Sequence, residues 1–167
     1  MGYHEHKEKA VKQVNCAVLT ISDTRSGQSD ESGPFIKERL EAEGHLVPYQ
    51  RVIPNDAAAI RQEMERLLAD GQVDVIVTSG GTGISRRDIT IESISPYLEK
   101  RLDGFGELFR HLTYEEIGSG GIMSRAVAGI ARGKIVVCLP GSPDAARVAL
   151  DRLLLPELGH LVWEARK

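Results

Sequence analysis

A glycine-rich turn and a carboxylate follow an apolar run in the middle of the chain. The run ends at Thr78, the turn spans Ser79-Gly-Gly-Thr-Gly83, and Asp88 comes shortly afterwards. Glycine lets the backbone turn its amide N–H groups into a concave anion site. A carboxylate beside a phosphate repels it unless a metal ion or a proton lies between them. The pattern predicts a phosphate or nucleotide site in which Asp88 binds Mg²⁺ or takes part in acid–base chemistry.

The glycine turn taken alone has two interpretations. Gly80, Gly81, Thr82 and Gly83 could surround a phosphate, or the glycines could simply allow a strand and a helix to pack closely. No Lys-Ser or Lys-Thr pair follows as in a Walker A loop, and the spacing is not G-x-G-x-x-G. The classical nucleotide-binding folds are therefore not indicated.

Further polar segments lie where predicted strands end or predicted helices begin. Ser22 and Asp23 follow the first apolar run, and Asp23 either takes part in a site or forms a local turn. Asn55 and Asp56 precede an amphipathic segment, where capping of a helix explains them well. The hypothesis of a site depends on whether such segments meet in space.

Two segments of the C-terminal half could contribute to the same site. Arg125, which follows Ser124, either binds phosphate through two N–H groups or is a solvated surface cation. Pro140, Gly141 and Ser142 end a strand and open a helix, so they either hold an anion or form a rigid turn.

Strand and helix patterns alternate along the chain. Apolar, β-branched runs predict strands over residues 14–21, 46–53, 73–78, 126–131 and 134–139. Apolar positions at helical spacing predict helices from about Pro34 to Gly44, after Asn55 or Asp56, from about Thr90 to Leu98, from Gly104 to the glycine cluster at 118–121, and after Pro143. Arg132-Gly133 predicts a hairpin between the last two strands.

This alternation predicts an α/β fold with a mostly parallel sheet, an antiparallel hairpin element and helices on both faces. Near-continuous apolar strands support a sheet buried on both sides. Such sheets bind ligands at the carboxyl ends of their strands, and both Ser22-Asp23 and Gly80 to Gly83 lie at such ends. We expect these two loops to converge on one edge of the sheet.

Length, composition and charge restrict the class of protein. The 167 residues, 41% of them hydrophobic, fit one domain over residues 14–167 after a flexible N-terminal tail at 1–13. A net charge of −3 argues against non-specific nucleic-acid binding. The charged N-terminal segment and the absence of a long apolar run favour a cytoplasmic protein without a membrane span. Cys16 and Cys138 lie in apolar runs, which predicts buried free thiols.

Five segments, taken together, form a more specific pattern than any one of them. They are Thr20-Ile-Ser-Asp23, Thr78-Ser-Gly-Gly-Thr-Gly83 with Arg87-Asp-Ile-Thr90, Gly104-Phe-Gly-Glu-Leu-Phe109, Ser124-Arg-Ala-Val-Ala-Gly129 and Leu139-Pro-Gly-Ser-Pro143. In this order, over almost the whole chain, they resemble the MoaB/MogA family of molybdenum cofactor biosynthesis proteins. The third segment and Tyr114-Glu-Glu-Ile117 are more similar to the MoaB branch.

The resemblance implies a three-layer molybdopterin-binding fold, self-association as a trimer or hexamer, and contacts with other proteins of the pathway. It also implies adenylylation of molybdopterin by ATP with Mg²⁺, which releases pyrophosphate. By matched position, Asp88 would be the main metal-binding or catalytic carboxylate, and Gly80 to Gly83 would surround phosphate. The matched segments also place Ser22, Asp23, Ser124, Arg125, Pro140, Gly141 and Ser142 in the adjoining pterin or nucleotide pocket.

One position departs from the family pattern. The family commonly carries an acidic residue directly after the proline where this chain has Asn55, so neighbouring Asp56 is the candidate to supply the second catalytic carboxylate. Asn55 itself could bind the cation only through its neutral oxygen. Two alternatives to the enzyme therefore remain open: a non-catalytic molybdopterin-binding or carrier protein of the same pathway, and an unrelated nucleotide-binding regulatory domain.

Overall fold

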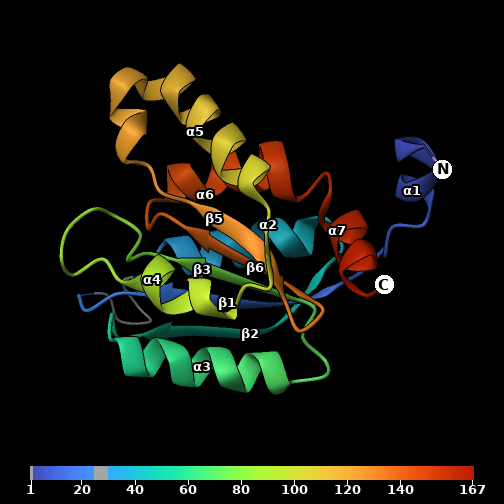
Figure 1. Ribbon diagram of the computed structural model, residues 1–167, viewed down its shortest axis with the longest axis horizontal. Coiled ribbons are helices and arrows are strands. Elements are labelled where there is room, and N and C mark those ends of the chain that lie inside the picture. Colours follow the sequence, from blue (N-terminus) through green and yellow to red (C-terminus); the bar gives the residue numbers. More distant parts are fainter. Residues whose placement is uncertain (1, 25–29) are drawn as a thin grey trace.

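The computed structural model describes residues 2–24 and 30–167, so the middle of the loop after the first strand, residues 25–29, lies outside the described residues. In the described part, six strands form one sheet in the order β2-β1-β3-β6-β5-β4. The strands are β1 (Asn15–Ile21), β2 (Leu46–Ile53), β3 (Val75–Ser79), β4 (Lys100–Arg101), β5 (Val127–Ala131) and β6 (Lys134–Leu139). Figure 1 shows this sheet between two layers of helices.

The helices lie on both faces of the sheet, as predicted. They are α1 (Tyr3–Glu8), α2 (Ser32–Ala42), α3 (Ala57–Ala69), α4 (Thr90–Ile94), α5 (Asp103–Ile117), α6 (Pro143–Ala149) and α7 (Leu158–Ala165). Short helical turns η1 (Ser95–Tyr97), η2 (Gly118–Met123) and η3 (Leu150–Leu154) follow α4, α5 and α6. Helices α2, α5, α6 and α7 cover one face, and α3 and α4 cover the other.

The strand pairing confirms the predicted mixture of parallel and antiparallel strands. Strands β2, β1, β3 and β6 pair in parallel, whereas β5 pairs antiparallel with β6 and β4 antiparallel with β5. The hairpin turns at Arg132 and Gly133, with φ of 48° and 73°, as a two-residue turn of primed type requires. The fold class predicted from the sequence is therefore confirmed.

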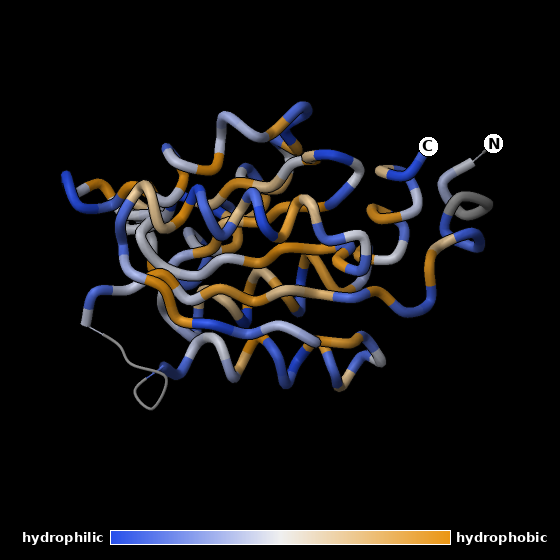
Figure 2. Tube along the Cα trace, turned by 90° about the horizontal axis from the view of Figure 1, so that it is seen from below, coloured by the Kyte–Doolittle hydropathy of each residue, from blue (hydrophilic) through white to orange (hydrophobic). Residues whose placement is uncertain are grey.

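Both faces of the central strands are buried, which explains their near-continuous apolar sequence. Val18 and Val77 pack against the first helical layer, while Leu19 and Ile76 pack against the second. Figure 2 shows these apolar strands crossing the middle of the molecule, with more polar segments outside them. The free thiols of Cys16 and Cys138 are buried on opposite faces, and burial raises the pKa of each, to about 12 and about 11 respectively.

Several element boundaries differ from the prediction for local reasons. Helix α2 begins at Ser32 rather than Pro34, because the Asp30 carboxylate accepts the N–H of Gly33 at 3.1 Å. The predicted helix to Leu98 ends as α4 at Ile94 and continues as the turn η1, where Pro96 has no N–H to donate. Helix α6 changes to a π-helical turn at Leu150, and the two-residue strand β4 was not predicted.

The N-terminal segment that was predicted to be a tail contains helix α1. Lys7 Nζ lies 3.0 Å from a Glu157 carboxylate oxygen, and the Val11 N–H donates to the Gly159 carbonyl at 3.1 Å. These contacts join the segment to α7 at the other end of the chain, as Figure 1 shows. Its flexibility stays a prediction. Among the described residues, no helix is long and apolar enough to cross a bilayer.

The two edge strands of the sheet are protected in different ways against pairing with another strand. Strand β4 is two residues long, and both of its side chains, Lys100 and Arg101, are exposed. Strand β2 is longer, but it carries the exposed Pro48 at a register shift against β1. An exposed proline and an irregular register in an edge strand disfavour pairing with another strand, as do short length and charge in β4.

Strand β3 ends in a turn that requires glycine. Gly80 has a φ of 104°, and a Cβ on this residue would lie 2.3 Å from the carbonyl oxygen of Ile21 at the end of β1. The Gly80 N–H donates to the Leu139 carbonyl at the end of β6. The ends of three neighbouring strands therefore meet at one backbone position.

We predict that Gly80→Ala lowers the free energy of unfolding by at least about 2 kcal/mol, since it combines an unfavourable φ with a backbone clash. Urea unfolding followed by circular dichroism measures this loss. Gly71→Ala is the matched control, because a Cβ there meets nothing within 4 Å. Equal stability of the two variants would contradict the steric argument.

His45 joins the start of β2 to the segment before β1. The Val14 N–H donates to His45 Nδ1 at 3.4 Å, and the imidazole is buried. Burial lowers the pKa of His45 from its ordinary value of 6.5, against the opposing effect of Glu43. The folded state therefore favours the neutral imidazole, whereas the unfolded chain protonates at the ordinary pKa.

We predict that this contribution to stability is complete above the ordinary pKa and is lost as the pH falls through that value toward the lowered pKa. The loss is at most about 1.4 kcal/mol per pH unit. His45→Asn keeps an acceptor without this titration, so its unfolding free energy should depend less on pH between about 7 and about 5. His111→Asn, at an exposed side chain, should retain the dependence of the unmodified protein. An unchanged slope in His45→Asn would refute the assignment.

Candidate functional site

A cavity of about 500 Å³ lies at the carboxyl edge of the parallel strands. It is lined by residues from four segments that are distant in the sequence: Ile21, Ser22, Thr24, Gly80, Gly81, Thr82, Gly83, Asp88, Met123, Ser124, Arg125, Pro140, Gly141 and Ser142. We call it the glycine-loop cavity. The predicted convergence of the segments around Ser22, Gly80, Ser124 and Pro140 is found in the structure.

The glycine loop presents backbone donors to this cavity. The Gly80 and Gly81 carbonyls accept hydrogen bonds from the side chain and the N–H of Thr90, at 2.8 and 2.9 Å. In the part of the chain that the structure describes, the N–H groups of Gly81, Thr82 and Gly83 have no acceptor. Consecutive free amides in a turn of fixed shape can bind an anion such as a phosphate.

Asp88 contributes the one carboxylate among the described residues that line this cavity. Its Oδ2 accepts hydrogen bonds from the N–H and hydroxyl of Ser85, at 3.0 and 2.7 Å. Its Oδ1 has no partner within the described ranges. Asp88 thus both closes the turn from Ser85 to Asp88 and leaves one oxygen available to a cation or a proton.

Arg125 contacts the glycine loop at its last residue, Gly83. Its Nη1 donates to the Gly83 carbonyl at 2.9 Å, and its Nη2 pairs with the Glu92 carboxylate. The guanidinium is about one third exposed and lines the cavity, so it is not a freely solvated surface cation. Part of its hydrogen-bonding capacity remains for a ligand, because guanidinium has five N–H donors.

Ser22 and Ser142 border the cavity at the ends of two strands. The Ser142 hydroxyl caps α6 by accepting the N–H of Ala145 at 3.2 Å, and Pro143 occupies the first turn of that helix. The Ser22 N–H donates to the Ile53 carbonyl, which fixes the start of its loop. The turn at Pro140 to Ser142 is therefore explained by local structure and also lines the cavity.

Three predicted site residues do not line the cavity. Asp56 is the N-cap of α3, where its carboxylate accepts the Ala59 N–H at 2.9 Å. Asp23 accepts the Asn55 N–H at 2.9 Å and so joins the loops that follow β1 and β2. The contact of Asp56 agrees with its predicted alternative as a helix cap, whereas Asp23 bonds to a distant loop instead of forming the local turn.

Asn55 contacts the segment that follows the glycine loop. Its Nδ2 donates to the Arg87 carbonyl, the position before Asp88. Its Oδ1 is buried, and a Cβ on Gly81 would lie only 3.0 Å from it. This oxygen accepts no hydrogen bond from the described residues.

A buried polar network beneath the cavity was not predicted. Asp30 is 7% exposed, and its carboxylate accepts the hydroxyl of Thr20 at 2.6 Å and that of Ser32 at 3.3 Å. The Ser79 hydroxyl lies 3.1 Å from Ser32 Oγ and donates to the Pro140 carbonyl at 3.2 Å. This network joins the ends of β1, β3 and β6. The sequence signal for this network is Asp30, which stands two residues before Ser32, the first residue of α2.

Comparison with known proteins agrees with this geometry. The family described as "Probable molybdopterin binding domain" matches residues 17–160. Molybdenum cofactor biosynthesis protein B of Bacillus cereus is 44% identical over 168 residues, which cover 100% of this chain and 99% of that protein. The protein of the same name from Bacillus subtilis is 43% identical over 168 residues, with the same coverage.

Solved structures show the same fold. A crystal structure of a molybdenum cofactor biosynthesis protein B has a TM-score of 0.89 and 44% identity, over 92% of this chain and 96% of that one. A tungsten cofactor synthesizing protein MoaB from Pyrococcus furiosus has a TM-score of 0.80 and 39% identity, over 95% of this chain and 100% of that one. An unrelated nucleotide-binding domain is therefore excluded, and the chain belongs to the MoaB/MogA family of molybdenum cofactor biosynthesis proteins.

Proposed function

We propose that this protein binds molybdopterin in the glycine-loop cavity and adenylylates it with ATP during molybdenum cofactor biosynthesis. The observation that supports this most directly is the set of free amides at Gly81, Thr82 and Gly83 beside the carboxylate of Asp88. Such a site suits a terminal phosphate whose charge must be neutralised by donors and by a cation.

In the proposed reaction, an oxygen of the molybdopterin phosphate forms a bond to the α-phosphorus of ATP. The bond from that phosphorus to the bridging oxygen of the β-phosphate breaks, and pyrophosphate leaves with the electron pair. The protein must hold two anions close together and in line, so positioning and electrostatics supply most of the catalysis. The glycine-loop amides would hold the attacking phosphate, and Arg125 would reduce the repulsion between the two anions.

The cavity fits one Mg²⁺ ion shared with substrate phosphates. Mg²⁺ is usually held by one or two carboxylates together with phosphate oxygens and water. Asp88 Oδ1 offers one such carboxylate oxygen, and the described residues hold no cluster of three or more His, Cys, Asp or Glu side chains suited to a metal. When bound, the ion would neutralise phosphate charge. Asp88 would hold it, and Asn55 could add only its neutral Oδ1 oxygen.

We predict that Asp88→Ala keeps the fold but lowers pyrophosphate release from molybdopterin, ATP and Mg²⁺ by at least about 100-fold. Asp88 is partly exposed and bonds only to Ser85, so its loss should shift the unfolding midpoint little. A pyrophosphate-release assay and thermal unfolding measure the two effects. Glu38→Ala, at an exposed carboxylate on α2, is the control. Unfolding of Asp88→Ala would show a structural role instead.

The second candidate function is a non-catalytic carrier of molybdopterin or of its adenylylated form. One observation favours it: a single carboxylate lines the described cavity, and the position next to Pro54 is the neutral Asn55. Tight molybdopterin binding without pyrophosphate release would support the carrier over the enzyme.

Substitution of Asn55 separates these two functions. In Asn55→Asp the carboxylate cannot donate to the Arg87 carbonyl, and it lies close to the acceptor Asp23. We predict a loss of about 1–3 kcal/mol in the free energy of unfolding and no gain in turnover. Chemical denaturation and the pyrophosphate assay test this. A gain in turnover above about tenfold would instead identify Asn55 as the defect of a degenerate site.

Self-association as a trimer or hexamer is part of the proposed function. Its support is a row of exposed apolar side chains on α5 and η2: Leu108, Tyr114, Ile117, Ile122 and Met123. The same helix buries Phe105 and Phe109 in the core. Helix α5 therefore has apolar side chains both on its buried face and on its exposed face. An exposed apolar surface of this kind is typical of a protein interface.

A further inference from the structure

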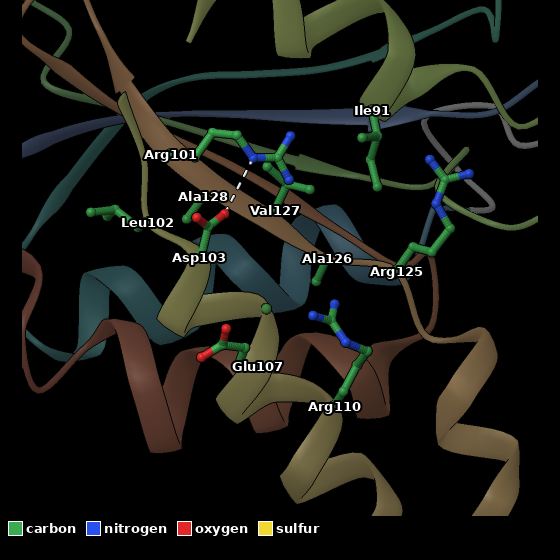
Figure 3. A pocket seen from close by; sticks show the side chains of 11 residues that line it. Ile91, Arg101, Leu102, Asp103, Glu107, Arg110, Arg125, Ala126, Val127 and Ala128 are labelled. Atoms are coloured by element: carbon green, nitrogen blue, oxygen red, sulfur yellow. Dashed lines mark hydrogen bonds and ion pairs between the residues drawn. The ribbon is translucent and has the colours of Figure 1, made fainter. Parts of the chain in front are cut away.

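A second cavity, of about 470 Å³, adjoins the glycine-loop cavity. It lies between the first turns of α5, the end of β4 and the segment that leads into β5, and Figure 3 shows it from close by. Arg125 lines both cavities. We call the second one the arginine cavity, because Arg101, Arg110 and Arg125 contribute its guanidinium groups.

Arginines outnumber carboxylates in the lining of the arginine cavity. Two carboxylates, Asp103 and Glu107, line it together with the three arginines. Arg101 lies 3.4 Å from Asp103, in an exposed pair that Figure 3 marks with a dashed line. Arg125 contacts Glu92. Arg110 is half-buried and has no hydrogen-bond or ion-pair partner among the described residues. A guanidinium in such a place is available to an anionic ligand.

The position of Arg110 depends on a glycine of the Gly104-Phe-Gly106 segment. A Cβ on Gly106 would lie 2.8 Å from the Ala126 carbonyl oxygen and 3.0 Å from Arg110 Nη1. The missing side chain lets α5 approach the start of β5 and lets the guanidinium lie against the helix. Phe105 and Phe109, buried beside it, fix this part of α5 on the core. Figure 3 shows Arg110 extending toward Ala126.

We propose that the arginine cavity binds the oligophosphate of the nucleotide co-substrate, that is, the part that leaves as pyrophosphate. This inference rests on the proposed adenylyl transfer and adds a separate place for the leaving group. Arg125 lies where the two cavities meet, so the α-phosphorus would be close to it. Arg101 and Arg110 then face the β- and γ-phosphates and stabilise the negative charge that pyrophosphate gains when its bond to the α-phosphorus breaks.

The chemistry of the lining favours an oligophosphate over a ligand with a single charge. The guanidinium groups come from β4, from α5 and from the segment before β5, and they surround the cavity rather than converging on one point. Each planar guanidinium can bind two oxygens at once. A ligand with several charges and many oxygens along its length matches this arrangement better than a single carboxylate does.

Binding of inorganic pyrophosphate to the full chain tests the proposal without molybdopterin or turnover. We expect calorimetry to show binding that weakens with salt and that becomes about tenfold weaker in Arg110→Gln. Arg152→Gln removes an exposed arginine that lines neither cavity, so its affinity should equal that of the unmodified protein. Thermal unfolding of each variant checks that the fold is kept.

Three outcomes would overturn the proposal: no binding of pyrophosphate to the unmodified protein, equal affinity in Arg110→Gln, or an equal loss in Arg152→Gln. Light scattering on the same samples explains the second outcome, since a changed mass with unchanged affinity would assign Arg110 to contacts between copies. Molybdopterin binding, measured separately in Arg110→Gln and Asp88→Ala, distinguishes the two proposals. If the unmodified protein binds pyrophosphate as expected but does not bind molybdopterin, the proposed function fails and the oligophosphate site stands.

Discussion

The close contact between the Gly80 backbone and the Ile21 carbonyl determines where a ligand site can form in this fold. It keeps the ends of β1 and β3 together at the point where their pairing stops, at Thr20 and Ser79. The chain then turns with two consecutive glycines at positive φ, which frees the following amides. A side chain at this position would push the ends of β1 and β3 apart.

The site is built more from backbone than from charged side chains. The glycine loop contributes unpaired amides, and the described lining adds one carboxylate and one guanidinium. The buried network of Asp30, Ser32 and Ser79 lies behind this lining and holds the strand ends at fixed separation. Such donors are preorganised for an anion, because they do not have to leave other partners when a ligand arrives.

The sequence predicted the fold well because strong local signals agreed with the global arrangement. Strand and helix periods and the Arg132-Gly133 turn each had a single physical explanation, and the structure confirms them. The roles of Asn55, Asp30 and Arg125 were harder to predict, since each depends on a contact with a residue at least ten positions away. Spacing along the chain shows which segments reach the same edge, but it does not show which side chains face the ligand and which support the loop.

The protected edges of the sheet restrict how copies of this chain can combine. Strand β4 is too short and too charged to accept another strand, and Pro48 interrupts the donors of β2. Growth of the sheet from one subunit into the next is therefore disfavoured on both sides. An assembly of this protein would join through helices, with the exposed face of α5 and η2 as the apolar surface available. Because α5 also carries Arg110, association and ligand binding would then share one rigid element.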